Sequence, residues 1–404
     1  MSTLPNPDAL RAHYRHFLPT TGPNAQRILL TGHSHQAWPD VAREAQLAAF
    51  DDAALYVDDK WARAFVAADA VRAAVVAQLG APSSRASDVA LASNTHELVA
   101  RVLSACELGT RRHVLSTRGE FHTVFRQLTR LAEAGLDVEL VDALPAETLA
   151  ERLAARVRDD TAAVLVSTVL FETSTVVENL SAVNEAAERH GAWVLLDAYH
   201  QVGVRAFDAS LLGPRTFVVG GGYKYLQWGE GNCFLVVPSE CTLRPVYTGW
   251  FAAFAHLADP RDGRPVGYGA RGAERFAGST YDPTSHYRAR AVARFFDEVG
   301  LTPSALHASY ARQTAKLGAL LDGHAARGAR GFTRISPDAA DARGGFVAVR
   351  VARASQLVDA LRACSVWVDA RGEIVRLGPA PYMRDDELEA GVAAFVEVAT
   401  ALGC

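Results

Sequence analysis

Short apolar runs of strand-forming residues alternate with longer helical patterns through the first two thirds of the chain. The runs lie at residues 27–31, 88–92, 113–117, 137–142, 162–170, 192–198, 216–221 and 233–237. The helical patterns between them include residues 41–51, 61–79, 97–106 and 183–190, the last of which stops at Gly191, as helices commonly do. This alternation is typical of a parallel sheet with crossover helices. We therefore predict an α/β fold built on a large mixed sheet.

The pattern changes after about residue 260. A loop rich in Gly, Pro and Arg precedes two helical patterns, weaker strands and a last helix, at residues 259–272, 286–300, 301–327, 332–335, 345–351, 366–369 and 385–402. We predict three parts. They are an N-terminal arm at residues 1–38 that packs with the small domain, a large domain at 39–265, and a smaller α+β C-terminal domain at 266–404.

Charge, hydropathy and cysteine usage narrow the function classes. With 45 acidic and 41 basic residues, the net charge of −4 gives no sign of a nucleic-acid partner. Residues 1–18 lack the apolar stretch of a signal peptide, and the longest apolar run, 162–171, has about ten residues where a membrane span needs about twenty. The five cysteines are widely spaced and form no CxxC pair. We expect a cytoplasmic protein that binds no nucleic acid, membrane or metal.

Lysine is scarce in this chain, and its only instances are Lys60, Lys224 and Lys316. Lys60 begins a charged helical pattern and Lys316 lies within an amphipathic one, both of which are typical of solvated side chains. Lys224 instead follows an apolar strand and three glycines and stands between two tyrosines. A desolvated amine there has a depressed pKa and can act as a nucleophile. A surface turn with a solvated lysine is the alternative.

The segment 192–203 carries a second chemical signal. Its apolar run places Asp197 at the carboxyl end of a strand, the edge where open α/β sheets bind ligands, and His200 follows three residues later. A carboxylate in that position keeps a heterocyclic nitrogen protonated, although an Asp at a strand end is also often a helix cap. Because Asp197 and Lys224 end consecutive predicted strands, we expect them at one site.

The chain resembles the class V aminotransferase family of pyridoxal-phosphate enzymes, and within it the kynureninases. The motifs that carry the resemblance are Asp-Ala-Tyr-His at 197–200, Tyr-Lys-Tyr-Leu at 223–226 and Gly-Trp-Phe at 249–251. The resemblance implies the fold type I architecture of pyridoxal-phosphate-dependent transferases. In that fold a large domain with a mainly parallel, mixed seven-stranded sheet flanked by helices is joined to a smaller α+β C-terminal domain.

The same resemblance implies that pyridoxal 5'-phosphate is bound as a Schiff base on Lys224. Asp197, with His200, then lies at the pyridine nitrogen, and Tyr223 and Trp250 lie at the phosphate. Further cofactor contacts are implied for residues that have ordinary structural alternatives, such as a helix cap or a core side chain. They are Asn94 and Thr95 at a helix N-terminus near the phosphate, Phe121 on the ring, Thr168 beside the ring hydroxyl, and Ser279 and Thr280 across the interface of a homodimer.

On the substrate side, Arg376 matches the arginine that binds the α-carboxylate in this family. A guanidinium group suits a bidentate grip on a carboxylate, and the apolar flanks of Arg376 argue against a solvated surface residue. His33, Ser34 and His35 occupy the place of the family's substrate loop and are candidate substrate contacts, with turn-stabilising polar residues as the alternative.

The resemblance implies an enzyme that acts on a small-molecule amino-acid substrate and forms a homodimer whose active site lies at the interface. The implied reaction is kynureninase-type hydrolysis of L-kynurenine to anthranilate and L-alanine. Val124 and the segment 249–253, Gly-Trp-Phe-Ala-Ala, depart from the kynureninase pattern. Other class V activities therefore stay open, namely isopenicillin-N-epimerase-like, aminotransferase and C–S lyase or cysteine desulfurase chemistry. Outside the family, the pair His33 and His35 leaves a metal-dependent amidohydrolase barrel as a remote alternative.

Overall fold

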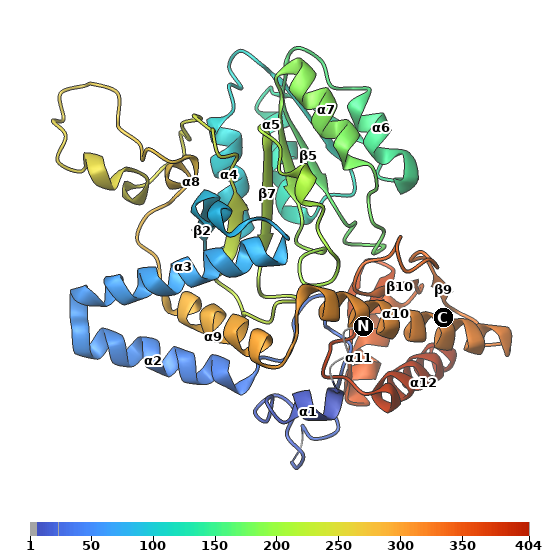
Figure 1. The fold of residues 1–404 in the computed structure, drawn as a ribbon. Helices are drawn as coiled ribbons and strands as arrows, with labels where there is room; N and C mark the ends of the chain where they lie inside the picture. The colour runs from blue at the N-terminus through green and yellow to red at the C-terminus, as the bar shows by residue number, and fades with distance from the viewer. Residues whose placement is uncertain (1–5, 23, 404) are drawn as a thin grey trace.

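A seven-stranded sheet forms the centre of the larger half of the molecule (Figure 1). The computed structural model describes residues 6–22 and 24–403. The strand order is β2-β8-β7-β6-β5-β3-β4, with bounds β2 (Val89–Ala92), β3 (His113–Thr117), β4 (Asp137–Val141), β5 (Thr161–Ser167), β6 (Trp193–Asp197), β7 (Thr216–Gly221) and β8 (Cys233–Val236). Only β8 runs against its neighbours. The predicted fold class, with its mixed and mainly parallel sheet, is confirmed.

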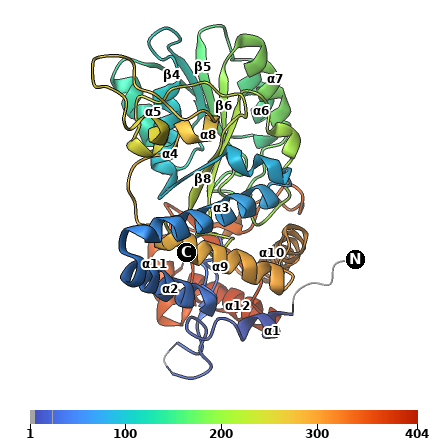
Figure 2. The same ribbon diagram turned by 60° about the vertical axis from the view of Figure 1, so that its left-hand side comes forward.

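Helices cover both faces of this sheet because its strands are apolar on both sides (Figure 2). Successive strand side chains point to opposite faces, so Leu195 packs in one core cluster and Leu196 in another. The helices are α4 (Thr95–Ala105) and α5 (His122–Glu133) in the first cluster, and α6 (Leu149–Ala154) and α7 (Leu180–His190) in the second. Helix α7 ends at Gly191 in the left-handed conformation, with φ 69°, as the sequence predicts.

A second sheet, of four antiparallel strands, lies in the C-terminal part in the order β12-β13-β10-β9. Its strands and helices are β9 (Thr333–Arg334), β10 (Val347–Arg350), β12 (Asp369–Arg371), β13 (Ile374–Leu377), α10 (Pro303–Ala326), α11 (Ala354–Ala363) and α12 (Asp385–Ala401). The predicted run 366–369 is divided in the structure. Its start forms β11 (Val366–Trp367), and its end opens the hairpin β12–β13, which turns at Gly372 with φ 56°.

The N-terminal segments connect the two halves. The run at 27–31 forms only a short strand, β1 (Ile28–Leu29), which pairs with β11 rather than with the large sheet. Helix α1 (Pro7–Arg11) contacts α12 through an ion pair of 2.8 Å between Arg11 and Glu387. The remaining helices are α2 (Asp40–Tyr56), α3 (Lys60–Gln78), α8 (Gly272–Arg275) and α9 (Thr284–Glu298), with 3-10 turns at Val57–Asp59, Ser83–Asp88, Ala146–Thr148, Ala209–Leu211 and Trp250–His256.

Helices α2 and α3 form a long hairpin that packs against α9 (Figures 1 and 2). None of the helices within the described part of the chain is long and apolar enough to cross a membrane. The division of the chain at residues 38 and 265 stays a prediction. The large sheet is open, so it does not provide the closed barrel that the amidohydrolase hypothesis requires.

Candidate active site

Lys224 lies just beyond the carboxyl end of β7, at the bottom of a buried cleft. Added Cβ atoms at Gly221 and Gly222 would collide with Tyr199 and Trp228, so these glycines let the backbone pass where a side chain has no room. Lys224 is only 5% exposed, and its Nζ lies 2.7 Å from Nε2 of His200. Burial lowers the pKa of this amine from 10.5 to about 7.

Asp197 ends the neighbouring strand β6, as predicted. Its carboxylate accepts a hydrogen bond of 2.9 Å from the backbone N–H of Tyr199. Burial raises the pKa of Asp197, whereas the Tyr199 N–H and the charge of Lys224 oppose that rise. The same carboxylate favours the charged form of Lys224. His200 is buried too, and burial together with the Lys224 charge lowers its pKa well below the ordinary value, so its imidazole is neutral.

Seven of the predicted cofactor residues line one cavity of about 240 Å³ around this pair. They are Asn94, Thr95, Phe121, Asp197, His200, Tyr223 and Lys224. The Lys224 Nζ lies 4.6 Å from the ring centre of Tyr199 and 5.5 Å from that of Phe121. The Asn94 side chain accepts a hydrogen bond of 2.9 Å from Glu97 N, so it caps α4 as the structural alternative predicted while still facing the cavity.

The other predicted cofactor residues lie elsewhere. Ser279 and Thr280 line a separate cavity of about 360 Å³, which shares Ser93 with the first. Trp250 is 45% exposed, and its Nε1–H donates a hydrogen bond of 3.1 Å to Oγ1 of Thr280. Thr168 is buried, and its hydroxyl donates to the backbone oxygen of Asp197 at 3.3 Å rather than facing the cavity.

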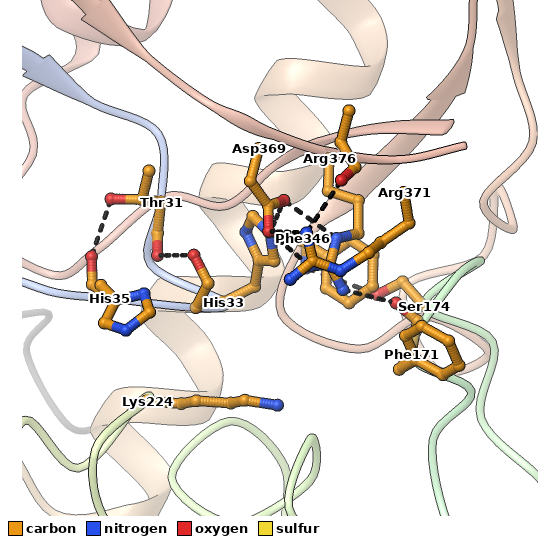
Figure 3. A network of polar contacts seen from close by, with 12 residues as sticks. Thr31, His33, His35, Phe171, Ser174, Lys224, Phe346, Asp369, Arg371 and Arg376 are labelled. Atoms are coloured by element: carbon orange, nitrogen blue, oxygen red, sulfur yellow. Dashed lines mark hydrogen bonds and ion pairs between the residues drawn. The ribbon is translucent and has the colours of Figure 1, made fainter. Parts of the chain in front are cut away.

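Arg376 projects from β13 and is almost completely buried, with 3% of its side chain exposed. Its Nε and Nη2 donate to the two carboxylate oxygens of Asp369 at 3.0 and 2.5 Å, and its Nη1 donates to the backbone oxygen of Phe171 at 2.9 Å (Figure 3). Burial alone would raise the pKa of Asp369, but His33 and Arg376 hold it well below its usual range. The carboxylate of Asp369 thus occupies the Nε–Nη2 edge of Arg376, the residue predicted to bind the substrate carboxylate.

The predicted substrate residues line a third cavity, of about 500 Å³, on the other side of Lys224. His33 is fully buried, with Nε2 at 2.7 Å from Asp369 Oδ1, and burial together with the Arg376 charge lowers its pKa to about 4. The Ser34 hydroxyl donates to the backbone oxygen of Thr31 at 3.2 Å. His35 is exposed and lies 3.6 Å from a Glu230 oxygen. All three residues therefore line the cavity that also contains Lys224 and Arg376, and their contact with substrate stays a prediction.

Two polar residues of this region were not predicted from the sequence. Glu120 is buried, accepts a hydrogen bond of 2.6 Å from the Ser167 hydroxyl, and has its pKa raised by burial to about 7. Its position directly before the predicted Phe121 was an available signal. Asp369 gave no such signal, because its role depends on the pairing of β12 with β13, which places it opposite Arg376.

A larger groove of about 800 Å³ lies along α4 and α5, but neither Lys224 nor Asp197 lines it. The smaller cavity at Lys224 has the chemistry that pyridoxal phosphate requires. It offers a buried amine for the aldehyde, a buried carboxylate for the ring nitrogen, an aromatic face at Phe121, and the N-terminus of the 11-residue helix α4 for an anionic group. The residues present therefore fit this cofactor.

Comparison with known proteins agrees with this site. A model of the class V aminotransferase family matches residues 57–226, and a model of the kynureninase C-terminal domain matches residues 311–395. The uncharacterized aminotransferase YcbU of Bacillus subtilis (strain 168) is 24% identical over 384 residues, which cover 94% of this chain and 95% of YcbU.

Two solved structures share the fold. The cystine C–S lyase C-DES, in complex with its reaction product cysteine persulfide, has a TM-score of 0.78 and 17% identity over 92% of this chain and 98% of its own. The cysteine desulfurase CsdA from Escherichia coli has a TM-score of 0.78 and 17% identity over 99% of this chain and 100% of its own.

The fold and the buried lysine–aspartate pair define an enzyme that depends on pyridoxal phosphate. Residues 57–226 of this PLP-dependent enzyme are similar to the class V aminotransferases, and its C-terminal part, residues 311–395, is similar to that of the kynureninases.

Proposed function

We propose that the protein hydrolyses the Cβ–Cγ bond of a γ-oxo amino acid, with L-kynurenine as the reference substrate and anthranilate and L-alanine as products. The observation that carries this proposal is the 500 Å³ cavity beside Lys224. Its far wall contains Trp367, Asp369 and Arg376, all within the segment matched by the kynureninase C-terminal domain. Phe121, Trp367 and other aromatic side chains in the lining suit an aryl side chain.

In this proposal, Lys224 holds the cofactor and later moves the α-proton of the substrate. An amine with a pKa near 7 accepts a proton readily at neutral pH, which suits a general base. Neutral His200 contacts the Lys224 Nζ and orients it. When bound, pyridoxal phosphate supplies the electron sink that makes the α-proton acidic. Asp197 keeps the ring nitrogen of that sink protonated.

Asn94, Thr95 and Tyr223 line the cofactor cavity, where we assign Tyr223 and the α4 N-terminus to the phosphate. Phe121 covers the ring, with Thr168 beside it acting through the backbone of Asp197. These roles come from the family resemblance and from the position of each side chain around one cavity.

Arg376 would bind the substrate α-carboxylate although Asp369 already contacts it. A guanidinium group has five N–H donors, and three of those of Arg376 are bonded to Asp369 and to the backbone of Phe171. One donor on each terminal nitrogen is left for a second carboxylate. Asp369 then fixes the plane of the guanidinium group, and His33 braces Asp369 from the other side.

We further propose that the protein is a homodimer. Trp250, Tyr247 and Phe254 expose 45%, 54% and 49% of their surface, an unusual cluster of large side chains on a monomer. This cluster adjoins Thr280, which together with Ser279 is predicted to reach the partner's phosphate site. Light scattering with size-exclusion chromatography measures the mass directly, and a monomer at micromolar concentration would contradict the proposal.

Adding L-kynurenine to the holoenzyme and following anthranilate fluorescence tests the reaction. We expect fluorescence with the wild type and with Lys316→Arg, which alters a partly exposed lysine outside the cavities at Lys224, but none with Lys224→Ala. Absence of anthranilate alongside normal cofactor absorbance would reject the kynurenine assignment. Conversion of the cofactor to its amine form without anthranilate would instead favour transamination, the second candidate, which the match to YcbU over 94% of the chain supports.

Cysteine desulfurase chemistry is less well supported by the site. It requires a nucleophilic thiolate near the substrate. Cys233 lines the cofactor cavity, but burial raises the pKa of its thiol to about 12. Cys364 is exposed at the end of α11. Among the described residues that line the substrate-side cavity there is no cysteine.

A further inference from the structure

The substrate-side cavity has an excess of positive charge. Four arginines line it, namely Arg27, Arg362, Arg371 and Arg376. Asp369 is the only acidic residue among its described lining residues, and Arg376 holds that carboxylate along one edge. His33 adds no further positive charge, because its pKa of about 4 makes it neutral. Three guanidinium groups are therefore left without a carboxylate of their own in the cavity wall.

Arg371 is the best placed of the three. It projects from β12 beside the Asp369–Arg376 pair and lines the same cavity as Lys224 (Figure 3). Its Nη1 donates to the backbone oxygen of Ala370 at 2.8 Å and lies 3.5 Å from Oδ2 of Asp369, beyond a strong hydrogen bond. Its side chain is 40% exposed, so it can turn toward a ligand without breaking a buried contact.

The other two arginines, Arg27 and Arg362, add positive charge to the same cavity wall. The guanidinium carbon of Arg362 lies 4.6 Å from the ring centre of Trp367, within the range of a cation–π contact. Arg27 donates through Nη2 to the backbone oxygen of Phe17 at 2.6 Å, and its buried Nε has no hydrogen-bond partner. The lining thus combines aromatic faces with unsatisfied cationic donors, which is the chemistry that recognises an aromatic carboxylate.

We propose that this cavity is a carboxylate-binding subsite that receives the acid product of the reaction, with Arg371 as its principal contact. The inference rests on the proposed function. In hydrolysis, the oxygen of water joins Cγ and the Cβ–Cγ bond breaks. Cβ then takes up a proton, and Cγ leaves as a carboxylate with release of one proton. A neutral ketone therefore becomes an anion at the position that Arg371 faces.

Isothermal titration of the holoenzyme with benzoate and with benzamide tests the subsite without any turnover. The two probes share size and shape but differ in charge, and a charge-assisted hydrogen bond changes affinity by about tenfold or more. We expect benzoate to bind at least about tenfold more tightly than benzamide. Arg371→Gln should remove most of that difference and leave benzamide binding unchanged, whereas Arg350→Gln, at an exposed position on β10, should behave as the wild type.

Equal binding of benzoate and benzamide by the wild type would overturn the proposal, whatever the behaviour of the variants. Unchanged benzoate affinity in Arg371→Gln would also overturn it, provided that the cofactor absorbance and melting temperature match the wild type. Because no step of this experiment needs catalysis, charge-selective binding without anthranilate formation from L-kynurenine would refute the proposed reaction while leaving the subsite in place.

Discussion

In the cofactor-free protein we expect Lys224 to lose its proton near neutral pH. Burial lowers its pKa from 10.5 to about 7, which disfavours the charged amine by roughly 5 kcal/mol at 1.36 kcal/mol per pH unit. The carboxylate of Asp197 opposes this shift, whereas the guanidinium groups of Arg376 and Arg371 add to it. The value therefore reports both the burial and the charge arrangement of the site.

The scarcity of lysine makes this measurement direct. Protein labelled with 13C at the lysine ε carbon carries three such positions, and Lys60→Arg and Lys316→Arg variants assign the signals. The chemical shift of the Lys224 signal is followed from pH 5 to pH 11. Asp197→Asn should move the midpoint further down, and Arg371→Gln should move it up. A Lys224 midpoint within one unit of 10.5, or an upward shift in Asp197→Asn, would refute the reasoning.

The same shift has a consequence for stability. Between about pH 7 and pH 10.5 the unfolded chain holds a proton on Lys224 that the folded chain has lost. Lys224 therefore destabilises the folded state most below pH 7, and this destabilisation declines as the pH rises from 7 to 10.5. Lys224→Met removes this contribution. We expect the cofactor-free variant to melt above the wild type at pH 6, by a margin that shrinks toward pH 10.

Three further predictions concern the neighbouring residues and the cofactor. Borohydride reduction of the holoenzyme followed by peptide mapping should label Lys224 alone, and a label on either other lysine would overturn the site assignment. Asp369→Asn should lower the free energy of unfolding by about 3 kcal/mol, because it leaves Arg376 buried without its partner. Asp322→Asn should cost less than about 1 kcal/mol in urea unfolding, because Asp322 is exposed and its partner Arg334 keeps a second ion pair, with Asp338. Folded Glu120 keeps its proton up to about pH 7, whereas the unfolded chain loses it near pH 4.5, so the stability of the protein falls as the pH rises through that window. In melting curves recorded from about pH 4 to about pH 8, Glu120→Gln should not show this fall in melting temperature.

Local signals in the sequence located the centre of the site. Lys224 and Asp197 could be found because each directly follows an apolar strand, and parallel strands deliver their carboxyl ends to one edge of a sheet. Phe121 could be placed by motif order alone. The role of Thr168 beside the ring stays a prediction: Ser167, the last residue of β5, lines the cavity, whereas the Thr168 hydroxyl donates to the backbone oxygen of Asp197.

The positions of the charged residues on the substrate side depend on the tertiary structure. Strand β13 is only four residues long, and its pattern, Ile-Val-Arg-Leu, gave no strand prediction even though Arg376 was recognised within it. The pairing of Asp369 with Arg376, and the exposure of Arg371 two residues after Asp369, follow from the register of β12 against β13. His33 reaches the same carboxylate from 336 positions away in the chain.

The sequence by itself therefore determined the fold class, through its apolar runs, and the cofactor, through the motifs that resemble a known family, and it identified Lys224 as the predicted point of attachment. Only the tertiary structure decided how the charges on the substrate side are shared. Ion pairs between short, distant segments depend on strand register and burial, and neither leaves a periodic pattern along the chain.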